Sequence, residues 1–427
     1  MTEIKSRIDG LSSRKRKLLA RWLDARAEDS VPNPPTTREA SSPPVKTIRT
    51  AGSAGQDEAE TRPRRPGAPS FSLFFFSADA DETAQENAFR YRLLIEAARF
   101  ADRHGFEAVW IPERHFHQFG GLYPNPSVLG SALAMVTERL ALRAGSVVLP
   151  LHHPVRVAEE WSVVDNLSLG RVGLAFASGW HAGDFVLFPE NYEHRRDVTM
   201  RNLDVVSRLW RGERVSLADG LGGEEEREIY PKPIQADLPV WVTAAGTEET
   251  FARAGRLGKN LLTNLLGQDV ERLAERIAVY RRERAAGGHD PETGRVTLMI
   301  HAFLGEDVEV IREAVRDPLC RYLQSFTSLV DQLARALDYP VDTDDLSERD
   351  MQSLLSFAFD RYFERSGLFG TPESCLPRVE QLVTAGVDEI ACLLDFGVAT
   401  DLVLGSLPYL DRLRELAAAH ASSRASG

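Results

Sequence analysis

The sequence predicts an α/β protein whose main domain is a closed (β/α)8 barrel, also called a TIM barrel. Three observations carry this prediction: eight short apolar runs follow one another between residues 70 and 397, amphipathic helical stretches separate them, and the 427-residue length accommodates one barrel with additions. Continuous apolar strands that alternate with helices are typical of a parallel sheet covered on both faces. Eight such units favour closure into a barrel over an open, doubly wound sheet.

The predicted strands are the runs SFSLFFF (70–76), AVWIPE (108–113), LRAGSVVLP (142–150), VGLAFASG (172–179), VWVTAAG (240–246), LLTNLLG (261–267), TLMIHAFLG (297–305) and EIACLLDFG (389–397). After the first run, residues 86–104 show the apolar spacing of a helix that covers the sheet with one face. Two stretches, about 180–238 and about 306–370, are longer than an ordinary βα unit. Because loops after the strands build the active sites of barrels, both stretches are candidate lids or substrate walls.

The chain divides into four predicted parts: a helical, docking-like segment (1–30), a disordered Pro-rich linker (31–69), the barrel (70–415) and a flexible tail (416–427). The linker holds 8 of the 23 prolines and no aromatic residue, so it cannot bury enough apolar surface to offset the entropy of ordering it. Residues 1–30 carry apolar side chains at helical spacing, with basic residues on the other face. They form either a marginal helix that packs on the barrel or a segment that docks on another protein.

Charge is unevenly distributed along the chain. Residues 1–69 carry 14 Lys and Arg against 9 Asp and Glu, whereas residues 70–427 carry 37 against 54. An acidic barrel argues against binding to nucleic acid. No apolar run approaches the roughly 18 residues that a membrane span needs, and the first residues lack the apolar core of a secretory signal. We therefore expect a cytoplasmic protein without membrane association, whose three cysteines are reduced.

The densest group of candidate catalytic residues follows the second predicted strand. In the segment WIPERHFHQFGG, Glu113, Arg114, His115 and His117 lie close together among phenylalanines. A histidine at this place is suited to general acid–base work or to a hydrogen bond with a cofactor, and the alternative is a surface loop with incidental charges. We expect no metal here, because no matching set of histidines and carboxylates is evident elsewhere in the sequence.

Small residues mark the ends of the third and fourth predicted strands. Gly145 and Ser146 lie inside the third strand, where a glycine often indicates a bulge or the close approach of a ligand. Ser178 and Gly179 offer a hydroxyl and an accessible backbone N–H to a phosphate. Trp180 is suited to wall a planar ring.

The fifth strand leads into the segment TAAGTEETFARAG, where Ala245, Gly246 and Thr247 precede a predicted helix. Free N–H groups at a helix N-terminus bind anions, so this turn is a second candidate phosphate contact, with ordinary capping as the alternative. His152 and His153 are interpreted as turn residues. No nucleophile elbow, Walker A loop or dinucleotide fingerprint is present in the sequence, which indicates that a cofactor carries the chemistry.

The chain from about residue 70 to residue 400 resembles the luciferase-like flavin monooxygenases, a (β/α)8 family of the bacterial-luciferase type. The matching pieces are GFEAVWIPERHFHQFGGLYPNPSV, LRAGSVVLPLHHPVRVAEEWSVVDNLSLGRVGLAFASGWHAGDF and LFGTPESCLPRVEQLVTAGVDEIACLLDFG, in the family's order. The likeness is greatest to the subgroup found within or beside nonribosomal peptide and polyketide synthetases. The segment GLSSRKRKLLARWL looks like the short segments found between synthetase domains.

This resemblance implies that reduced FMN, supplied by a separate flavin reductase, reacts with O2 to give a flavin peroxide that oxygenates a substrate. It implies that the Ser178–Gly179 turn and the turn of Ala245, Gly246 and Thr247 hold the FMN phosphate. The Gly145–Ser146 bond matches the position of a non-prolyl cis peptide bond that lies against the flavin in some members. The predicted cofactor-binding set is completed by Phe76, Trp180 and Thr243.

Two positions depart from bacterial luciferase. That enzyme has a catalytic histidine where this chain has Arg114, next to the matching His115, so either His115 takes over its role or Arg114 stabilises the peroxide anion. It also has an arginine on the phosphate where this chain has Ser178, which implies a phosphate held mainly by neutral donors. Arg114 and His115 are therefore the predicted catalytic residues, and the residues expected to shape the site are Glu113, His117 and His181.

The sequence thus predicts an FMN-dependent monooxygenase of natural-product biosynthesis that hydroxylates an amino-acyl, peptidyl or polyketide intermediate on a carrier protein. The family implies a homodimer. Two alternatives stay open: a deazaflavin-dependent oxidoreductase of the same superfamily, which transfers hydride without consuming O2, and a non-catalytic partner in an assembly line. The charged residues after the second strand argue against the non-catalytic alternative, because a site without activity has no need of them.

Overall fold

The computed structural model describes residues 68–76, 84–117, 120–244, 247–265, 268–336, 359–360 and 362–425. The predicted docking segment and the Pro-rich linker up to residue 67 lie outside these ranges. Ala245 and Gly246, of the predicted phosphate turn, also lie outside them.

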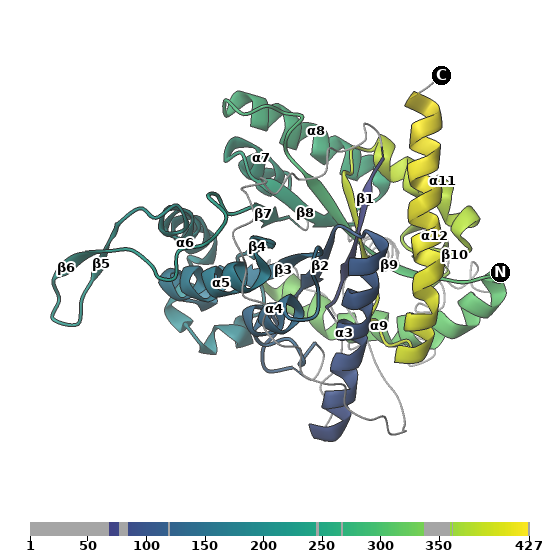
Figure 1. Cartoon of the computed structure of the whole chain (residues 1–427), viewed down its shortest axis with the longest axis horizontal. Coiled ribbons are helices and arrows are strands. Elements are labelled where there is room, and N and C mark those ends of the chain that lie inside the picture. The colour runs from purple at the N-terminus through teal and green to yellow at the C-terminus, as the bar shows by residue number, and fades with distance from the viewer. Residues whose placement is uncertain are drawn as a thin grey trace, which may run out of the picture.

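Eight parallel strands form a closed barrel (Figure 1). Their hydrogen-bonded order is β9-β11-β1-β2-β3-β4-β7-β8, and β8 pairs back with β9 to close the ring. Each strand coincides with one of the eight predicted runs, so the predicted fold class is confirmed. The bounds are β1 Ser70–Phe74, β2 Ala108–Ile111, β3 Ala141–Val148, β4 Val172–Ala177, β7 Val240–Thr243, β8 Asn260–Asn264, β9 Val296–Leu304 and β11 Glu389–Leu393.

Helices connect successive strands and surround the barrel (Figure 1). Their bounds are α3 Ala84–His104, α4 Pro126–Ala134, α5 Pro154–Ser168, α6 Arg195–Trp210, α7 Glu248–Arg256, α8 Val270–Ala286, α9 Val308–Ala336, α11 Pro372–Thr384 and α12 Thr400–Ala425. Short 3-10 helices are η1 Leu149–Leu151, η2 Ala182–Val186 and η3 Pro189–Asn191. Over the described residues, no helix combines the length and the apolar character that crossing a membrane requires.

Two further pieces of sheet lie outside the ring. Strand β10 (Leu368–Gly370) pairs in parallel with the end of β9. Strands β5 (Val215–Ala218) and β6 (Glu224–Arg227) form an antiparallel hairpin that projects from the body (Figure 1).

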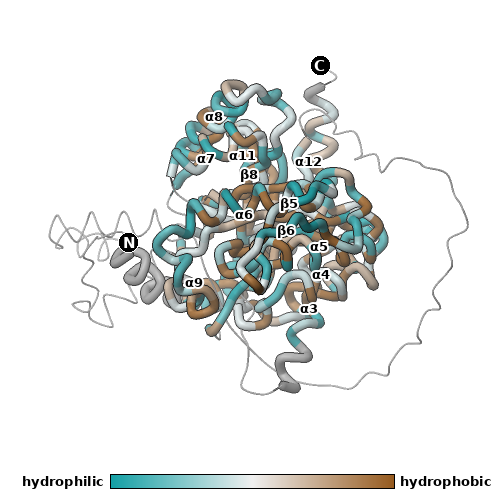
Figure 2. Tube along the Cα trace, turned by 90° about the vertical axis from the view of Figure 1, so that its left-hand side faces the viewer, coloured by the Kyte–Doolittle hydropathy of each residue, from teal (hydrophilic) through white to brown (hydrophobic). Residues whose placement is uncertain are grey.

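Local sequence fixes where several helices begin and which face they bury. The side chain of Asn125 caps α4 by accepting the backbone N–H of Ser127 at 2.9 Å, and Pro126 occupies the first helical position. Along α3, Leu94 and Ala97 are buried against the barrel, as the helical spacing predicts. Figure 2 shows hydrophobic and hydrophilic stretches alternating along the outer helices, which is the pattern expected of helices with one buried face.

Two predicted boundaries differ from the structure. The stretch 180–238 is not a single insertion, because α6 packs against α5 as an ordinary barrel helix. Only η2 and η3 before α6, and the hairpin after it, are additional. At the C-terminus, α12 continues to Ala425 and buries Ala417, so helical structure extends beyond residue 415, where the sequence analysis places the start of a tail.

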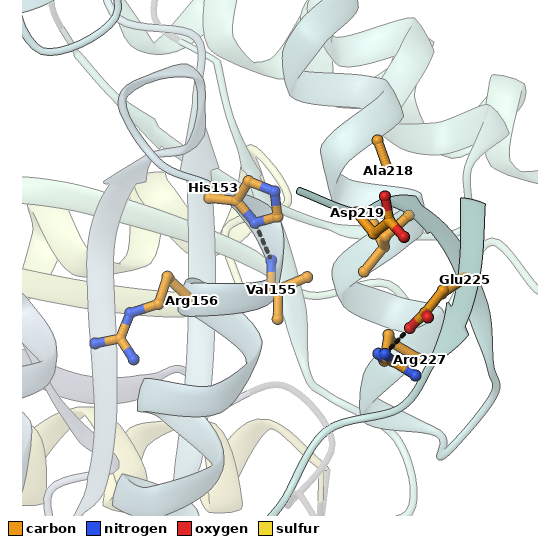
Figure 3. Close-up of a pocket in the computed structure, with 8 residues that line it drawn as sticks. His153, Val155, Arg156, Ala218, Asp219, Glu225 and Arg227 are labelled. Atoms are coloured by element: carbon orange, nitrogen blue, oxygen red, sulfur yellow. Dashed lines mark hydrogen bonds and ion pairs between the residues drawn. The ribbon is translucent and has the colours of Figure 1, made fainter. Parts of the chain in front are cut away.

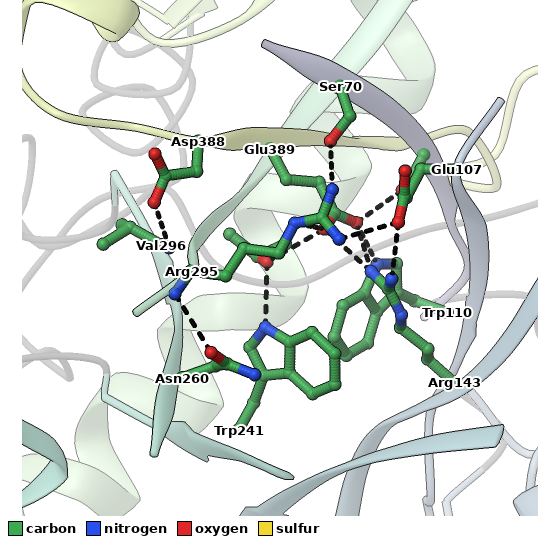
Figure 4. Close-up of polar contacts among 12 residues, drawn as sticks. Ser70, Glu107, Trp110, Arg143, Trp241, Asn260, Arg295, Val296, Asp388 and Glu389 are labelled. Carbon is green, nitrogen blue, oxygen red and sulfur yellow. Dashed lines mark hydrogen bonds and ion pairs between the residues drawn. The ribbon is translucent and has the colours of Figure 1, made fainter. Parts of the chain in front are cut away.

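A buried ion network fills the barrel at the N-terminal ends of the strands (Figure 4). Glu389, the first residue of β11, is fully buried, and its carboxylate accepts a bond from Nη1 of Arg143 at 2.7 Å. Nε of Arg295 lies 3.0 Å from the same carboxylate, and Trp110 donates its indole N–H at 3.0 Å. Burial raises the pKa of Glu389, but the charges of Arg143 and Arg295 outweigh burial and hold this pKa well below its usual range.

Aromatic rings pack against this buried ion network. The guanidinium of Arg143 lies over the rings of Trp110 and Trp241, at 5.2 and 4.6 Å from their centroids. The two indoles meet edge to face, with centroids 5.2 Å apart. Paired charges and packed rings therefore close this end of the barrel, and the opposite end carries the exposed polar groups described next.

Candidate active site

A buried carboxylate joins the ends of β2 and β3. Glu113 follows β2 by two residues, and its side chain is fully buried. Its Oε1 lies 2.8 Å from Nε2 of His115 and 2.6 Å from Nε2 of His152, while Oε2 accepts the backbone N–H of Val148 at 2.9 Å. Three donors thus satisfy one carboxylate, so Glu113 orients both imidazoles.

The charges of this cluster follow from these bonds. Burial raises the pKa of Glu113, but the bonds from His115 and His152 outweigh it, so the pKa lies below its usual value of 4.5. Burial lowers the pKa of His152, but the bond to Glu113 outweighs it, so this pKa lies above 6.5. A neutral His115 must donate its Nε2 proton to Glu113, which leaves Nδ1 as the basic nitrogen.

The next residue, Arg114, lies against the end of β1. Its guanidinium carbon is 5.0 Å from the centroid of the Phe76 ring, and its backbone N–H donates to the carbonyl of Tyr123 at 2.9 Å. Asp395, which follows β11, accepts the backbone N–H of Phe76 at 2.9 Å and the hydroxyl of Tyr123 at 2.8 Å. Burial and the charge of Asp395 raise the pKa of Tyr123 well above its usual value, so this hydroxyl stays a donor. These bonds fix Phe76 and Arg114 at the mouth of the barrel.

Small and hydroxylated residues line the ends of β3 and β7. The Gly145–Ser146 peptide bond is cis, as the family resemblance implies. A Cβ on Gly145 would meet the ring of Phe74 from β1 at 2.9 Å and that of Trp110 from β2 at 3.0 Å, so the packing requires glycine here. Oγ of Ser146 lies 2.6 Å from Oγ1 of Thr243, and both side chains are half-buried. This side of the barrel mouth therefore offers hydroxyl donors beside a closely packed glycine.

The turn after β4 contains the predicted phosphate contacts. Gly179 has a φ of 71°, and a Cβ there would meet Cγ1 of Val148 at 2.8 Å, so the turn requires glycine. Nε of Arg195 donates to the carbonyl of Gly179 at 3.2 Å. Sequence analysis expects mainly neutral donors around Ser178, and the structure adds the positive charge of Arg195 beside this turn.

The start of α7 is a weaker anion site than the sequence indicates. Thr247 occupies the N-cap position, but its hydroxyl lies 2.8 Å from that of Thr250 and makes no bond that caps the helix. Glu248 and Glu249 fill the first turn and are exposed, so their charges oppose a bound anion. Because β4 and β7 are hydrogen-bonded neighbours, the Ser178–Gly179 turn lies on the adjacent strand end.

Two predicted histidines meet across the mouth of the barrel. Nε2 of His117, from the loop after β2, lies 3.2 Å from Nδ1 of His181, which follows β4. The same Nδ1 lies 3.2 Å from Oδ1 of Asp184. Burial, His181 and Arg114 lower the pKa of His117 below 6.5, although Asp184 opposes this. The sequence analysis finds no histidine and carboxylate set for a metal, whereas the structure brings His117, His181 and Asp184 within reach of one another.

The described residues fit a flavin. Gly145 and Gly179 let the backbone pack closely against the side chains of Phe74 and Val148, which shapes the two strand ends at the mouth of the barrel. Phe76 and Trp180 offer ring surfaces, and Ser146 and Thr243 offer hydroxyl groups. Arg195 supplies a cation beside the phosphate turn. We find no feature among these residues that would exclude the cofactor.

A separate pocket of about 370 Å³ lies between the start of α5 and the β5–β6 hairpin (Figure 3). It is lined by residues that include His153, Arg156, Asp219 and Arg227. Glu225 and Arg227 form an ion pair on the hairpin. None of the predicted site residues lines this pocket, so the strand ends remain the candidate site.

These observations define a class of protein: a barrel enzyme with a buried carboxylate–histidine cluster and an aromatic, hydroxyl-lined surface at the C-terminal ends of its strands. Residues 70–389 match the family described as luciferase-like monooxygenase, and the chain belongs to that family. It is therefore a flavin-dependent oxidoreductase of the monooxygenase class.

Similar proteins agree with this assignment. The alkanal monooxygenase alpha chain of Photorhabdus laumondii is 22% identical over 333 residues, which cover 74% of this chain and 88% of the relative. The oxygenase component of the flavin-dependent trigonelline monooxygenase of Acinetobacter baylyi is 22% identical over 351 residues, which cover 79% and 92%.

Solved structures share the fold. Monooxygenase RslO1 from Streptomyces bottropensis has a TM-score of 0.64 and 22% identity, covering 80% of this chain and 98% of that chain. The oxygenating constituent of 3,6-diketocamphane monooxygenase from Pseudomonas putida, in complex with FMN, has a TM-score of 0.61, 18% identity and coverages of 80% and 98%. An F420-dependent secondary alcohol dehydrogenase has a TM-score of 0.57, 16% identity and coverages of 80% and 99%.

The structure brings most predicted site residues together in pairs. These pairs are Glu113 with His115, His117 with His181, Arg114 with Phe76, and Ser146 with Thr243. Sequence reasoning missed three residues: His152, which it interprets as a turn residue, Asp184 and Arg195. The signal for Asp184 is its position three residues after His181, whereas nothing in the sequence brings His152 to Glu113 or Arg195 to Gly179.

Proposed function

We propose that the protein is the oxygenase component of a two-component FMN-dependent monooxygenase, which receives reduced FMN from a separate reductase and uses O2. The observation that carries this proposal is the barrel mouth itself, where the hydroxyls of Ser146 and Thr243 and the cation of Arg195 suit a flavin ring and phosphate. Glu113 faces Nε2 of His115 there, which leaves Nδ1 as the basic nitrogen of the neutral ring. When bound, reduced flavin would supply the electrons that activate O2.

The chain's own residues would position and exchange protons. Glu113 holds the Nε2 proton of His115, so that Nδ1 accepts or returns a proton at the reacting group. Arg114, fixed over Phe76, would stabilise negative charge that develops on oxygen. These two roles are the two alternatives that the sequence leaves open at this position, and neighbouring side chains in one site would perform both.

An anaerobic titration with reduced FMN, followed by admission of O2, tests the proposal. We expect saturable binding and a bound flavin whose reoxidation, followed by absorbance, differs from that of free flavin. Absence of binding would contradict the FMN assignment. Binding of reduced deazaflavin F420, with substrate oxidation that consumes no O2, would instead support the alternative of an F420-dependent oxidoreductase, a cofactor that one protein of the same fold uses.

The substrate proposed is an amino-acyl, peptidyl or polyketide intermediate on a carrier protein in natural-product biosynthesis. Its support is the resemblance of residues 10–23 to segments between synthetase domains, followed by a Pro-rich stretch long enough to act as a tether. Deletion of residues 1–60 should lower turnover of a carrier-bound substrate while leaving reduced FMN binding unchanged. Equal turnover of the truncated and full-length proteins at low protein concentration would contradict the docking role.

We also propose a cytoplasmic homodimer that associates through α4 and α5. Large apolar side chains are exposed on these two packed helices and their ends, including Val128, Met135, Leu167 and Leu169, at 64, 67, 46 and 78% exposure. Several large exposed apolar side chains on two packed helices suit an interface with a second copy of the chain. Light scattering after size exclusion should give twice the chain mass of 47.5 kDa, and Leu167→Glu should shift the protein toward the monomer.

A further inference from the structure

We propose that His117, His181 and Asp184 form a binding site for a divalent transition-metal ion of the zinc type at the mouth of the barrel. The three facing atoms are separated by 3.2 Å (His117 Nε2 to His181 Nδ1), 3.2 Å (His181 Nδ1 to Asp184 Oδ1) and 3.8 Å (His117 Nε2 to Asp184 Oδ1). A point equidistant from these atoms lies about 2 Å from each, which is the length of a Zn–N or Zn–O bond.

Hydrogen bonding alone satisfies this arrangement poorly. Nδ1 of His181 carries either one proton or one lone pair, yet it faces both His117 and Asp184. If it donates to Asp184, it cannot accept a proton from Nε2 of His117. A cation at the centre uses the lone pairs of all three atoms at once, so the convergence favours a metal over any single proton placement.

The backbone holds two of the ligands in place. His181 is the N-cap residue of η2, and Asp184 lies in the first turn of that helix, so both side chains project from one turn. Gly183 lies beneath the imidazole, where a Cβ would meet Cε1 of His181 at 2.8 Å. Glycine at this position thus permits the ring orientation that directs Nδ1 toward His117.

Nearby charges both oppose and favour a bound cation. The guanidinium of Arg114 opposes a nearby cation. The carboxylate of Asp184 offsets one positive charge of the ion. The exposed fractions of the His117, His181 and Asp184 side chains are 37, 13 and 19%, so the ion has access from solvent.

Three protein ligands leave a fourth position open in tetrahedral coordination. Sites of this composition, with two histidines and one carboxylate, keep that position for water or a substrate oxygen. The ligand class for the open position is therefore an oxygen donor such as a carbonyl or carboxylate of the substrate. The inference is independent of the proposed flavin chemistry, because metal binding is measured without flavin.

Metal binding to the tag-free, full-length protein after EDTA treatment and dialysis tests the site. Zn²⁺ is titrated by calorimetry, and Co²⁺ by visible absorption, which reports tetrahedral coordination. We expect one ion per chain, with the intense visible bands of tetrahedral Co²⁺. All ten histidines lie within the described residues, and residues 1–67 contain neither histidine nor cysteine, so the N-terminal part adds no such ligand.

Variants assign the ion to these residues. His117→Ala, His181→Ala and Asp184→Asn should each weaken binding by about 100-fold or more, since loss of an outer-shell partner alone costs about 10–100-fold. The exposed His194, whose side chain makes no capping bond, provides the matched control His194→Ala, which should bind like the wild type. Circular dichroism and thermal melting confirm that each variant folds.

Two results would overturn the proposal. One is the absence of any stoichiometric binding of Zn²⁺ or Co²⁺ to the folded wild-type protein. The other is binding that survives in folded Asp184→Asn and His181→Ala proteins with unchanged affinity. Gly183→Ala gives a further check, because its Cβ displaces the His181 ring and should weaken Co²⁺ binding while all three ligands remain.

Discussion

The two ends of the barrel each bury a glutamate, but they surround it with different cations. At the N-terminal ends of the strands, Glu389 faces Arg143 and Arg295, whose charges do not change in the physiological range. At the C-terminal ends, Glu113 faces His115 and His152, whose imidazoles belong to the residue type that exchanges protons in catalysis. An ion network of fixed charge thus closes the N-terminal end of the barrel, whereas the C-terminal end carries a site that can exchange protons.

The largest expected effect comes from disrupting the buried ion network around Glu389. In Glu389→Gln, Arg143 and Arg295 stay buried without their main counter-charge, and breaking a buried pair typically costs about 3–5 kcal/mol of unfolding free energy. Urea denaturation measures the change. The matched control is Glu249→Gln, which removes an exposed ion pair with Arg256 and should change the unfolding free energy far less. If both variants lost the same unfolding free energy, the buried network would stabilise the protein no more than an exposed ion pair does.

At the other end, a substitution should affect activity more than stability. His115→Ala removes the proposed proton acceptor, and loss of a general acid–base group lowers turnover by about 100-fold or more. Since only one bond to Glu113 is lost, the unfolding free energy should fall by about 1–2 kcal/mol. Turnover under saturating reduced FMN and O2, together with urea denaturation, separates the two effects. Wild-type turnover in a folded His115→Ala protein would remove His115 from the mechanism.

The comparison also predicts that stability depends on pH through the Glu113 cluster at the C-terminal end of the barrel and not through the Glu389 network. The pKa of His152 is raised above 6.5 in the folded protein, so its bond to Glu113 contributes fully below about pH 6.5 and is lost as pH rises through the folded-state pKa. The pKa of Glu113 is lowered below 4.5, so its contribution is present above that value and is lost as pH falls through the folded-state pKa.

His152→Gln should therefore cost about 1–2 kcal/mol of unfolding free energy near pH 6 and less near pH 9. Thermal or urea unfolding of the wild type and the variant across this range measures the difference. The cost of Glu389→Gln should stay constant over the same range, because no partner of Glu389 in the network titrates there. A constant cost for His152→Gln would contradict the assignment of charge to this cluster.

The same contrast explains what the sequence predicts well. All eight barrel strands follow from local apolar runs, since a strand buried on both faces is apolar throughout. Glu113, Arg114 and His115 are equally visible, because they follow a strand directly in sequence. Both kinds of feature are local, and local features need no knowledge of how distant segments pair.

Other features depend on closure of the barrel. Arg143 and Glu389 are far apart in sequence and meet only because β3 and β11 line one interior, so no local pattern identifies their network. Similarly, His117 and Asp184 come from the loops after β2 and β4 and meet at the barrel mouth. The sequence therefore brings His181 and Asp184 together by their spacing, but nothing local in it adds His117 to the set.

The smallest predicted effect concerns the hydroxyl pair at the ends of β3 and β7. Thr243→Val keeps the side-chain shape but removes the bond to Ser146, which should cost about 1 kcal/mol of unfolding free energy or less. If these hydroxyls also contact the cofactor, the affinity for reduced FMN should fall by a similar free energy, about fivefold. Anaerobic titration measures this affinity, with Thr384→Val on the exposed surface of α11 as the control. A loss of stability with unchanged affinity would make the pair part of the barrel's framework, so the proton-exchanging end would then be limited to the Glu113 cluster and the histidines opposite it.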